Sequence, residues 1–513
     1  MDAIMRRIAA AVGQQSDELL EISARDAVER IRSGDLSAEA YVTRLLRQNE
    51  SCKALNLVNA IDAERVMEAA RAVDRSRARG AKLGPAAGLP FAVKDQISVA
   101  GYPTTAGNGA LRGYVPKHHA AVVDSLVRAG AIPFCMTAVP DMAVSDGIMH
   151  QVSSYSEAFG EVHNPYDRGR LPGGSSGGSA GVLAARIVPA ALGLDTNGSI
   201  RCPSAFSGVA GLRPSTWTIA NALNGARRKR YSEDGVLLPP LTRLDTVGPM
   251  ARTVSDVAFL DALITGERAP VIDLRRVRIA VPGGDFWEQE PVDPGVAAVV
   301  GEALAKLRDA GCTLVEIDFD REVRSLVGTI DKPSQASVFG ALGMNAPLQS
   351  SETMADWLRE NAPDVTVEQM YHGRPIRDRK PTLPSEAEQV AVLRETSRRY
   401  AELYASHGVA AIAYPTIPLV ATPIRARGPM EPVGELLTIN GVTIAEGLVI
   451  ARNLFIAPRL GAPALNIPAG LSNGLPVGLQ LDALPGHDSE LLGLGIAVER
   501  VFGRIPAPRV AQR

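Results

Sequence analysis

Residues 171–201 read LPGGSSGGSAGVLAARIVPAALGLDTNGSIR, with a glycine- and serine-rich turn on each side of an apolar stretch. The first turn spans 172–179. The second, at 197–199, follows an apolar run that is expected to be buried. An apolar helix is expected between them, at 180–187. Flexible glycine–serine linkers are not embedded between core elements, so the segment is expected to form two shaped loops inside a folded core.

Three familiar motifs do not account for the first turn. A phosphate-binding loop ends in Gly-Lys-Ser/Thr, and no lysine lies between Gly173 and Arg186. A dinucleotide-binding turn follows a strand, whereas residues 164–172 have the composition of a loop. Residues 173–177 match the G-x-S-x-G elbow of α/β-hydrolases, but that elbow also follows a strand and needs a histidine base. None of the seven histidines lies in an obvious motif.

A lysine is the alternative base. Lys94 directly follows the apolar strand expected at 91–93. An ordinary lysine pKa of ~10.4 leaves the amine protonated at neutral pH, but burial lowers it by up to ~3–5 units. Taken alone, such a lysine is more often a paired structural residue. Together with two serine-bearing loops, Lys94 becomes a candidate for a Ser-Ser-Lys proton relay.

Short apolar strands alternate with helices along most of the chain. The first eighty residues are expected to be helical, at 17–33, from Ser37 onward and at 62–80. Beyond them we expect strands at 91–93, 131–135, 277–281, 312–319 and 409–414, and helices at 120–129, 254–265, 294–310 and 388–406. This alternation predicts an α/β fold with a sheet covered by helices on both faces.

The composition excludes several other classes of protein. Of 513 residues, 46% are hydrophobic, and 54 Lys and Arg against 56 Asp and Glu leave a formal charge of −2, which disfavours nucleic-acid binding. Four dispersed cysteines without a CxxC pair argue against a structural zinc site and for a reducing compartment. Arg186 and Pro189 interrupt the longest apolar run, so no membrane helix is expected. We therefore predict a cytoplasmic protein.

Several segments together resemble the amidase signature family. The signature-like segments are 88–95, 172–180 and 195–214, and further similar segments are 35–39, 243–252, 414–416 and 474–480. The resemblance covers most of the chain. It implies one amidase signature domain over 1–513, built on a large mixed, twisted sheet with helices on both faces. Within it, 1–80 would wrap the core, 88–260 would form the signature core and 320–385 a variable substrate-pocket region.

The resemblance also implies site residues. Ser199 matches the acylated nucleophile, Ser175 the bridging serine that follows a cis peptide bond, and Lys94 the base. The oxyanion hole would be formed by backbone N–H groups of Thr196, Asn197, Gly198 and Ser199, supported by Asp195, Arg201 and Ser176. No metal or organic cofactor is implied. Ser179 is expected only as an N-terminal residue of the following helix.

One position departs from the family pattern. Where the family usually has Gly-Gly-Ser, this chain has Asn197-Gly198-Ser199. Asparagine tolerates the left-handed backbone region better than most residues, so the turn is expected to survive. The Asn197 side chain would either crowd the oxyanion hole or add a donor to it.

The implied activity is hydrolysis of small amides, releasing ammonia or an amine. Residues 230–236 and 242–249 resemble the branch that contains indoleacetamide and mandelamide hydrolases, which favours an aryl or arylalkyl acyl group. Carbamates, anilides and esters are alternatives with the same triad. The pocket walls are expected from 138–152, 320–375 and 440–456, with candidate residues Phe339, Met344 and Trp357.

A second kind of function is carried by the same family. It includes the A-type subunit of glutaminyl-tRNA amidotransferase, which works in a complex and passes ammonia on. Asn197 and the lack of a basic face weigh against that role here. The expected partner is therefore a small-molecule amide, with neither nucleic acid nor membrane, and the family also allows a homodimer.

Overall fold

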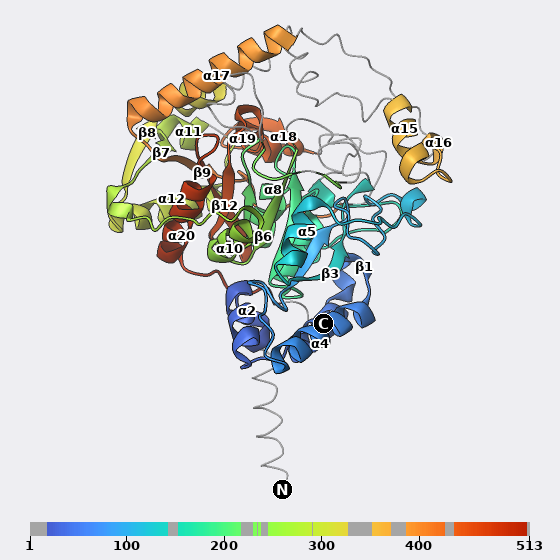
Figure 1. The fold of residues 1–513 in the computed structure, drawn as a ribbon. Coiled ribbons are helices and arrows are strands. Elements are labelled where there is room, and N and C mark those ends of the chain that lie inside the picture. Colours follow the sequence, from blue (N-terminus) through green and yellow to red (C-terminus); the bar gives the residue numbers. More distant parts are fainter. Residues whose placement is uncertain are drawn as a thin grey trace.

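A large sheet runs through the molecule (Figure 1). The computed structural model describes residues 18–141, 152–216, 229–232, 234–236, 245–289, 291–326, 351–370, 386–425 and 435–509. Within these residues the sheet has 11 strands in the order β1-β3-β2-β4-β6-β5-β12-β13-β9-β7-β8. They are β1 (Val58–Ile61), β2 (Pro90–Lys94), β3 (Ile132–Thr137), β4 (Ala190–Asp195), β5 (Ala210–Arg213), β6 (Thr246–Ala251), β7 (Arg278–Pro282), β8 (Thr313–Ile317), β9 (Ala411–Pro415), β12 (Ala464–Ser472) and β13 (Leu475–Asp482).

The sheet mixes parallel and antiparallel pairs, which confirms the expected fold class. β2 lies between β3 and β4 and runs parallel to both, and β7 runs parallel to β8 and β9. The other neighbouring pairs are antiparallel. Because parallel strands end at the same edge of a sheet, Lys94, Thr137 and Asp195, the last residues of β2, β3 and β4, gather at one edge. Sites in open α/β sheets form beyond such strand ends.

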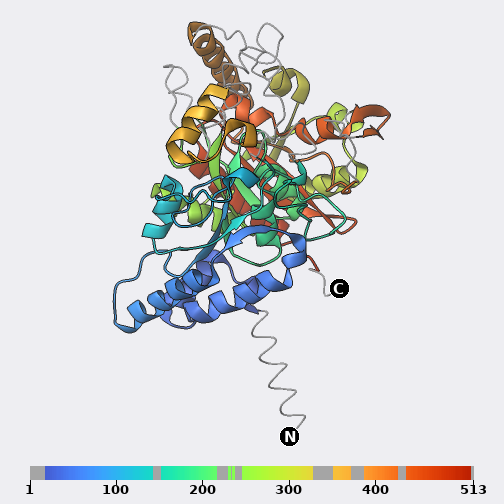
Figure 2. The ribbon, with the colours of Figure 1, turned by 90° about the vertical axis from the view of Figure 1, so that its right-hand side faces the viewer.

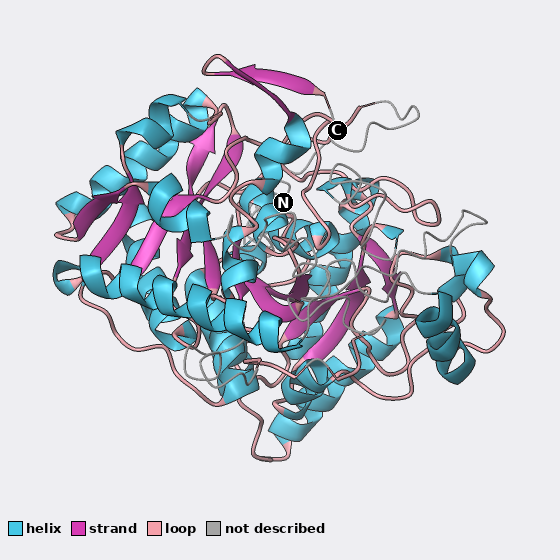
Figure 3. Cartoon of the chain, turned by 90° about the horizontal axis from the view of Figure 1, so that it is seen from above, coloured by secondary structure: helices cyan, strands magenta, loops and turns pink. Residues whose placement is uncertain are grey.

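Helices cover both faces of the sheet, as Figure 3 shows from above. Phe91 and Val93 of β2 pack into the core beside α5 (Ala121–Arg128) and α10 (Val254–Thr265). Ala92 points the other way, into the core that α7 (Gly177–Ala184) covers. Side chains alternate between the faces of a strand, so Lys94 shares the face of Ala92, toward α7. Other helices that pack on the sheet include α8 (Arg201–Ser207), α12 (Pro294–Asp309) and α20 (Asp488–Phe502).

The N-terminal helices, blue in Figure 2, lie beneath the sheet. They are α2 (Ala24–Ser33), α3 (Ala38–Ser51) and α4 (Ala63–Ala78). The hydroxyl of Ser37 accepts a hydrogen bond from the Ala40 N–H, which confirms the expected start of α3. The helix expected at 17–33 is wrong as one element, because Ser23 interrupts it and caps α2 by accepting from the Asp26 N–H. Residues 58–61 are also not helical, since they pair with β3 as β1.

The helix expected at 180–187 begins three residues earlier, at Gly177. The glycines there serve close packing: a Cβ on Gly178 would lie 2.4 Å from the backbone nitrogen of Ala138. The remaining expected strands and helices agree with the structure to within a few residues. Two hairpins had not been expected: β12–β13, and β10 (Leu436–Ile439) with β11 (Val442–Ala445).

The region above the sheet holds longer and more irregular connections. Its helices include α11 (Gly284–Gln289), α15 (Ser351–Asn361), α16 (Val367–Met370), α17 (Glu386–His407), α18 (Glu446–Ala451) and α19 (Ile456–Leu460). Short helical turns elsewhere in the described chain include Lys53–Leu55, Gly109–Leu111, Leu274–Arg276 and Asp320–Arg324. Of the expected pocket region, only 320–326 and 351–370 are described, so Phe339 and Met344 lie outside the described residues. Trp357 lies on α15 with its ring centroid 5.5 Å from that of Tyr114. No helix among the described residues could span a membrane.

Candidate active site

Lys94 and Ser175 lie in direct contact at the carboxyl edge of β2. Lys94 is fully buried, and its Nζ lies 2.7 Å from the Ser175 Oγ. Ser175 comes just before α7, and the peptide bond that joins Gly174 to Ser175 is cis, as the family resemblance implied. The alternation along β2 thus brings together two predicted residues that are 81 positions apart in the sequence.

Burial changes the acid–base character of Lys94. It lowers the pKa of the amine to about 7, because a buried ammonium loses its hydration. The negative charges of Asp245 and Asp195 act in the opposite direction and raise this pKa. A lysine with a pKa near 7 is partly neutral at physiological pH, so it can accept a proton.

The predicted nucleophile loop, residues 196–199, is shaped by the carboxylate of Asp195 at the end of β4. Its Oδ1 accepts a hydrogen bond from the Gly198 N–H at 2.9 Å, and its Oδ2 accepts one from the Ile200 N–H at 3.2 Å. Gly198 has φ +108°, a left-handed conformation that favours glycine. A Cβ there would also lie 2.6 Å from Leu454 Cδ1. The loop is therefore fixed from within by Asp195 and packed from outside by Leu454.

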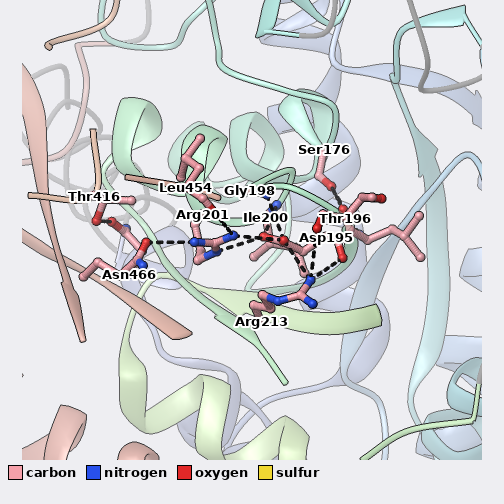
Figure 4. Close-up of polar contacts among 12 residues, drawn as sticks. Ser176, Asp195, Thr196, Gly198, Ile200, Arg201, Arg213, Thr416, Leu454 and Asn466 are labelled. Atoms are coloured by element: carbon pink, nitrogen blue, oxygen red, sulfur yellow. Dashed lines mark hydrogen bonds and ion pairs between the residues drawn. The ribbon is translucent and has the colours of Figure 1, made fainter. Parts of the chain in front are cut away.

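Two buried arginines hold Asp195 in turn (Figure 4). Arg201 donates from Nε to Oδ2 at 3.1 Å and from Nη2 to Oδ1 at 3.2 Å. Arg213 donates from Nη1 to Oδ1 at 3.1 Å and to the Asp195 carbonyl at 2.7 Å. Although burial alone would raise the pKa of Asp195, the two guanidinium groups hold it well below its usual range. Asp195 and Arg201 were predicted, whereas Arg213, in the signature-like segment 195–214, had been given no role.

The serine loop and the nucleophile loop are joined by their backbones. The Ser176 N–H donates to the Ser199 carbonyl at 3.1 Å. Gly173 lies against the first turn of α8, where a Cβ would come within 2.6 Å of Pro203 Cα. Ser154, which had not been predicted, donates to the Gly173 carbonyl at 3.1 Å. These close approaches explain why the sequence has glycines here, and they place the Ser175 loop beside the Ser199 loop.

The other two serines of the run face the sheet. Ser176 Oγ lies 3.3 Å from both the backbone nitrogen and the carbonyl oxygen of Leu194. Ser179 Oγ lies 2.7 Å from Thr137 Oγ1 and donates to the Leu192 carbonyl at 3.1 Å. Both hydroxyls tie the start of α7 to β4 beneath it.

Asp245 is a buried acid at the site that sequence reasoning missed. It directly precedes β6, whose first residue, Thr246, pairs with Asp195. Its Oδ1 accepts a hydrogen bond from the Thr196 hydroxyl, and its carbonyl accepts one from Lys229 Nζ at 2.6 Å. Segment 243–252 had been noted only for its resemblance to the family, and the antiparallel register between β4 and β6 is what brings Asp245 to the nucleophile loop.

The residues predicted for catalysis, for the oxyanion hole and for its support gather at this edge: Lys94, Ser175, Ser176, Asp195, Thr196, Asn197, Gly198, Ser199 and Arg201. Of the predicted pocket walls, 440–456 reaches the site through Leu454, while 142–151 lies outside the described residues. In the described part of the chain, no group of three or more His, Cys, Asp or Glu side chains is placed to hold a metal ion.

The chain is similar to known amidases along most of its length. A family model described as Amidase matches residues 38–492. The A-type subunit of glutamyl-tRNA(Gln) amidotransferase from Chloroflexus aurantiacus is 32% identical over 519 residues, covering 94% of this chain and 97% of its own. The indoleacetamide hydrolase of Agrobacterium vitis is 31% identical over 489 residues, covering 93% and 96%.

Solved structures agree with these sequence matches. A crystal structure of an amidase superposes with a TM-score of 0.73 at 26% identity, covering 94% of this chain and 100% of that one. The peptide amidase of Stenotrophomonas maltophilia shares the fold with a TM-score of 0.70 at 24% identity, covering 96% and 99%.

Proposed function

Because the chain belongs to the amidase family and is an amide-hydrolysing enzyme, we propose that it cleaves small aryl or arylalkyl amides through Ser199, Ser175 and Lys94. One observation carries the assignment of these residues. A fully buried lysine, with a pKa lowered to about 7, lies 2.7 Å from a serine hydroxyl on the loop that is bonded to the Ser199 backbone.

The proposed reaction is acyl transfer in two halves. Neutral Lys94 takes the proton of Ser175 while Ser175 takes the proton of Ser199, whose Oγ attacks the amide carbonyl carbon. The C–N bond then breaks, the proton returns through Ser175 to the leaving nitrogen, and ammonia or an amine departs. Water attacks the resulting ester along the same proton path, releasing the carboxylic acid and free Ser199.

The negative oxygen that forms during attack needs donors from the nucleophile loop. Four N–H groups were predicted for this role, at 196 to 199. The Gly198 N–H donates to Asp195 Oδ1, so we assign Gly198 to shaping the loop and the stabilisation of the oxyanion to other donors of the same loop. Loss of one such donor typically lowers kcat by roughly 10²–10³-fold.

The acyl group is assigned from two kinds of support. Residues 230–236 and 242–249 resemble the indoleacetamide and mandelamide hydrolase branch, and the Agrobacterium vitis indoleacetamide hydrolase aligns over nearly the whole chain. The apolar side chain of Leu454 packs directly on Gly198, next to the nucleophile. An apolar side chain this close to the proposed nucleophile favours an aryl or arylalkyl acyl group. Carbamates, anilides and esters offer the same carbonyl to Ser199.

The test measures ammonia and amine release from a panel of phenylacetamide, indoleacetamide, mandelamide, an anilide, an aryl carbamate and glutamine. The variants are Ser199→Ala, Ser175→Ala and Lys94→Ala, with Ser179→Ala as the matched control. Ser179 is a buried serine of the same run, and its hydroxyl bonds Thr137 and Leu192. We expect turnover of an arylalkyl amide to vanish in the first three variants and to persist in the control.

Two results would contradict the proposal. Turnover that survives in Ser199→Ala would show that another residue is the nucleophile. If the carbamate or the anilide is turned over faster than every primary amide, the assignment of the triad stands, but the proposed substrate class is wrong.

A second candidate function is supported by the amidotransferase relatives. The A-type subunits of glutamyl-tRNA(Gln) amidotransferase from three bacteria are 32% identical to this chain over at least 94% of its length. Ammonia release from glutamine alone within the panel, together with tightly bound partner proteins after gentle purification, would favour that role over a free-standing hydrolase.

A further inference from the structure

Two segments noted in the sequence without a role, 414–416 and 474–480, meet behind the nucleophile loop. Tyr414 lies on β9 and Gln480 on β13, and the two residues are direct partners in the antiparallel register. Both side chains are fully buried. Directly opposed residues of neighbouring strands project to the same face, so these two polar side chains lie next to each other inside the core.

Gln480 completes the coordination of the Arg201 guanidinium. Arg201 Nη1 donates to Gln480 Oε1 at 3.1 Å, while Nη2 donates to the Leu454 carbonyl at 2.8 Å and to Asp195. With Nε also on Asp195, every nitrogen of this guanidinium has an acceptor. A buried guanidinium can turn only if it abandons such bonds, so Gln480 restricts the orientation that Arg201 presents to Asp195.

The orientation of the Gln480 amide is itself dictated by a carboxylate. Gln480 Nε2 donates to Asp482 Oδ1 at 2.8 Å and to the Tyr414 hydroxyl at 2.7 Å. The Tyr414 hydroxyl donates in turn to Asp482 Oδ2. An ionised carboxylate only accepts hydrogen bonds, so Asp482 must face the amide N–H and the tyrosine O–H. The amide oxygen of Gln480 is thereby left pointing at Arg201.

We propose that Tyr414, Gln480 and Asp482 are positioning residues for the nucleophile loop. The bonds run from Asp482 to Gln480, to Arg201, to Asp195 and from there to the Gly198 N–H, one residue before Ser199. This inference rests on the proposed assignment of Ser199 as the nucleophile. Misplacement of a reacting group by about 1 Å can cost roughly 10²-fold in rate, so a loosened Arg201 is expected to slow the chemical step.

Tyr404 provides an internal comparison. It too is buried, and its hydroxyl donates to Asp482, but to the backbone carbonyl, at 2.8 Å, rather than to the carboxylate. Its other hydroxyl partner is Tyr400, at 3.0 Å. Tyr404→Phe therefore removes a buried hydroxyl bonded to the same residue without touching the bonds that orient the Gln480 amide.

The experiment compares Tyr414→Phe with Tyr404→Phe. It adds Gln480→Leu, which removes the amide that bonds Arg201 directly. Each variant is measured for its Tm, for kcat and KM on the best amide of the panel, and for the rate at which a serine-directed fluorophosphonate labels Ser199. In Tyr414→Phe and Gln480→Leu we expect kcat to fall by roughly 10- to 100-fold with KM nearly unchanged, and labelling to slow in parallel. Tyr404→Phe should keep wild-type kcat and labelling even though its Tm also falls.

Equal activity of Tyr414→Phe and Tyr404→Phe at similar Tm would overturn the inference, because a purely structural role predicts that result. Tyr414→Phe keeps the test valid if Gln480→Leu does not fold. If the fluorophosphonate labels the wild-type protein at a residue other than Ser199, the proposed function is refuted, and this inference with it. That failure is seen in the wild type alone, so it can be told apart from a failure of this inference, which is seen only in the variants.

Discussion

Lys94 Nζ and Ser175 Oγ lie 2.7 Å apart, with the lysine fully buried at the end of a strand and the serine on the cis-linked loop before a helix. Neither the strand that carries Lys94 nor the loop that carries Ser175 would make Lys94 a working base by itself. The strand buries the amine and lowers its pKa to about 7, and the loop places beside it the hydroxyl with which it exchanges a proton in the proposed reaction. The pH behaviour of the enzyme follows from this contact.

The first prediction concerns the pH–rate profile. Only the neutral amine of Lys94 can accept the Ser175 proton, so kcat/KM is expected to rise as pH passes through about 7 and then to level off. The measurement is kcat/KM for the best panel amide between pH 5 and pH 9. A profile that is flat across this range would argue against Lys94 as the base.

The second prediction is that one substitution shifts the pH profile of kcat/KM. The carboxylate of Asp245 raises the pKa of Lys94, so Asp245→Asn should shift the rising limb of the kcat/KM profile to lower pH. Asparagine keeps an oxygen for the bond from the Thr196 hydroxyl. The control is Asp273→Asn, which removes an exposed carboxylate paired with Arg275 and should leave the limb in place. A limb that moves to higher pH would contradict the sign of this interaction.

The third prediction concerns the stability cost of the base. The pKa of Lys94 is about 7 in the folded protein and 10.5 for the side chain in water, so the unfolded chain binds more protons between these values. The Lys94 amine should therefore make the wild-type protein more stable as pH rises from about 7 towards 10.5. Lys94→Met lacks the titration, so its Tm advantage over wild type should be largest at pH 7 and below and should shrink at higher pH. A pH-independent difference between the two Tm curves would refute the burial effect.

The fourth prediction concerns the shape of the nucleophile loop. Gly198→Ala combines a left-handed backbone, which costs a non-glycine residue ~1–3 kcal/mol, with crowding against Leu454. Gly474→Ala is the matched control, since Gly474 has φ +81° on a hairpin turn with open space around it. Both variants should lose stability in urea unfolding, and only Gly198→Ala should lose kcat by roughly 10²-fold or more. Equal kcat in both would mean that the loop tolerates distortion.

The fifth prediction concerns the buried ion cluster. Asp195→Asn would leave Arg201 and Arg213, both fully buried, without their shared carboxylate. Removing one partner of a buried ion pair typically costs ~3–5 kcal/mol, which urea unfolding would detect. Because the Gly198 N–H also loses its charged acceptor, activity should fall even under conditions where the variant stays folded. If Asp195→Asn keeps both its stability and its activity, Asp195 does not hold the nucleophile loop in place.

The sequence predicted the catalytic candidates better than it predicted what holds them. Lys94, Ser175 and Ser199 lie in short motifs, and the short apolar run at 91–93 indicated the strand that carries the lysine. Arg213, Asp245 and Gln480 reach the same loop only through the pairing of β4, β5, β6, β12 and β13, and strand order is not visible in a local pattern. The interruption at Ser23 shows the converse, since a local capping bond divided a helix that apolar periodicity had joined.

The place of β13 in the sheet has a consequence for how the protein is made. This strand lies inside the sheet, between β12 and β9, yet it ends only at Asp482. A ribosome adds residues 94, 175 and 199 long before it adds Gln480. The growing chain therefore carries the proposed nucleophile and base for most of its synthesis without the strand that orients Arg201. Hydrolytic activity is expected to emerge late, once the C-terminal hairpin has entered the sheet.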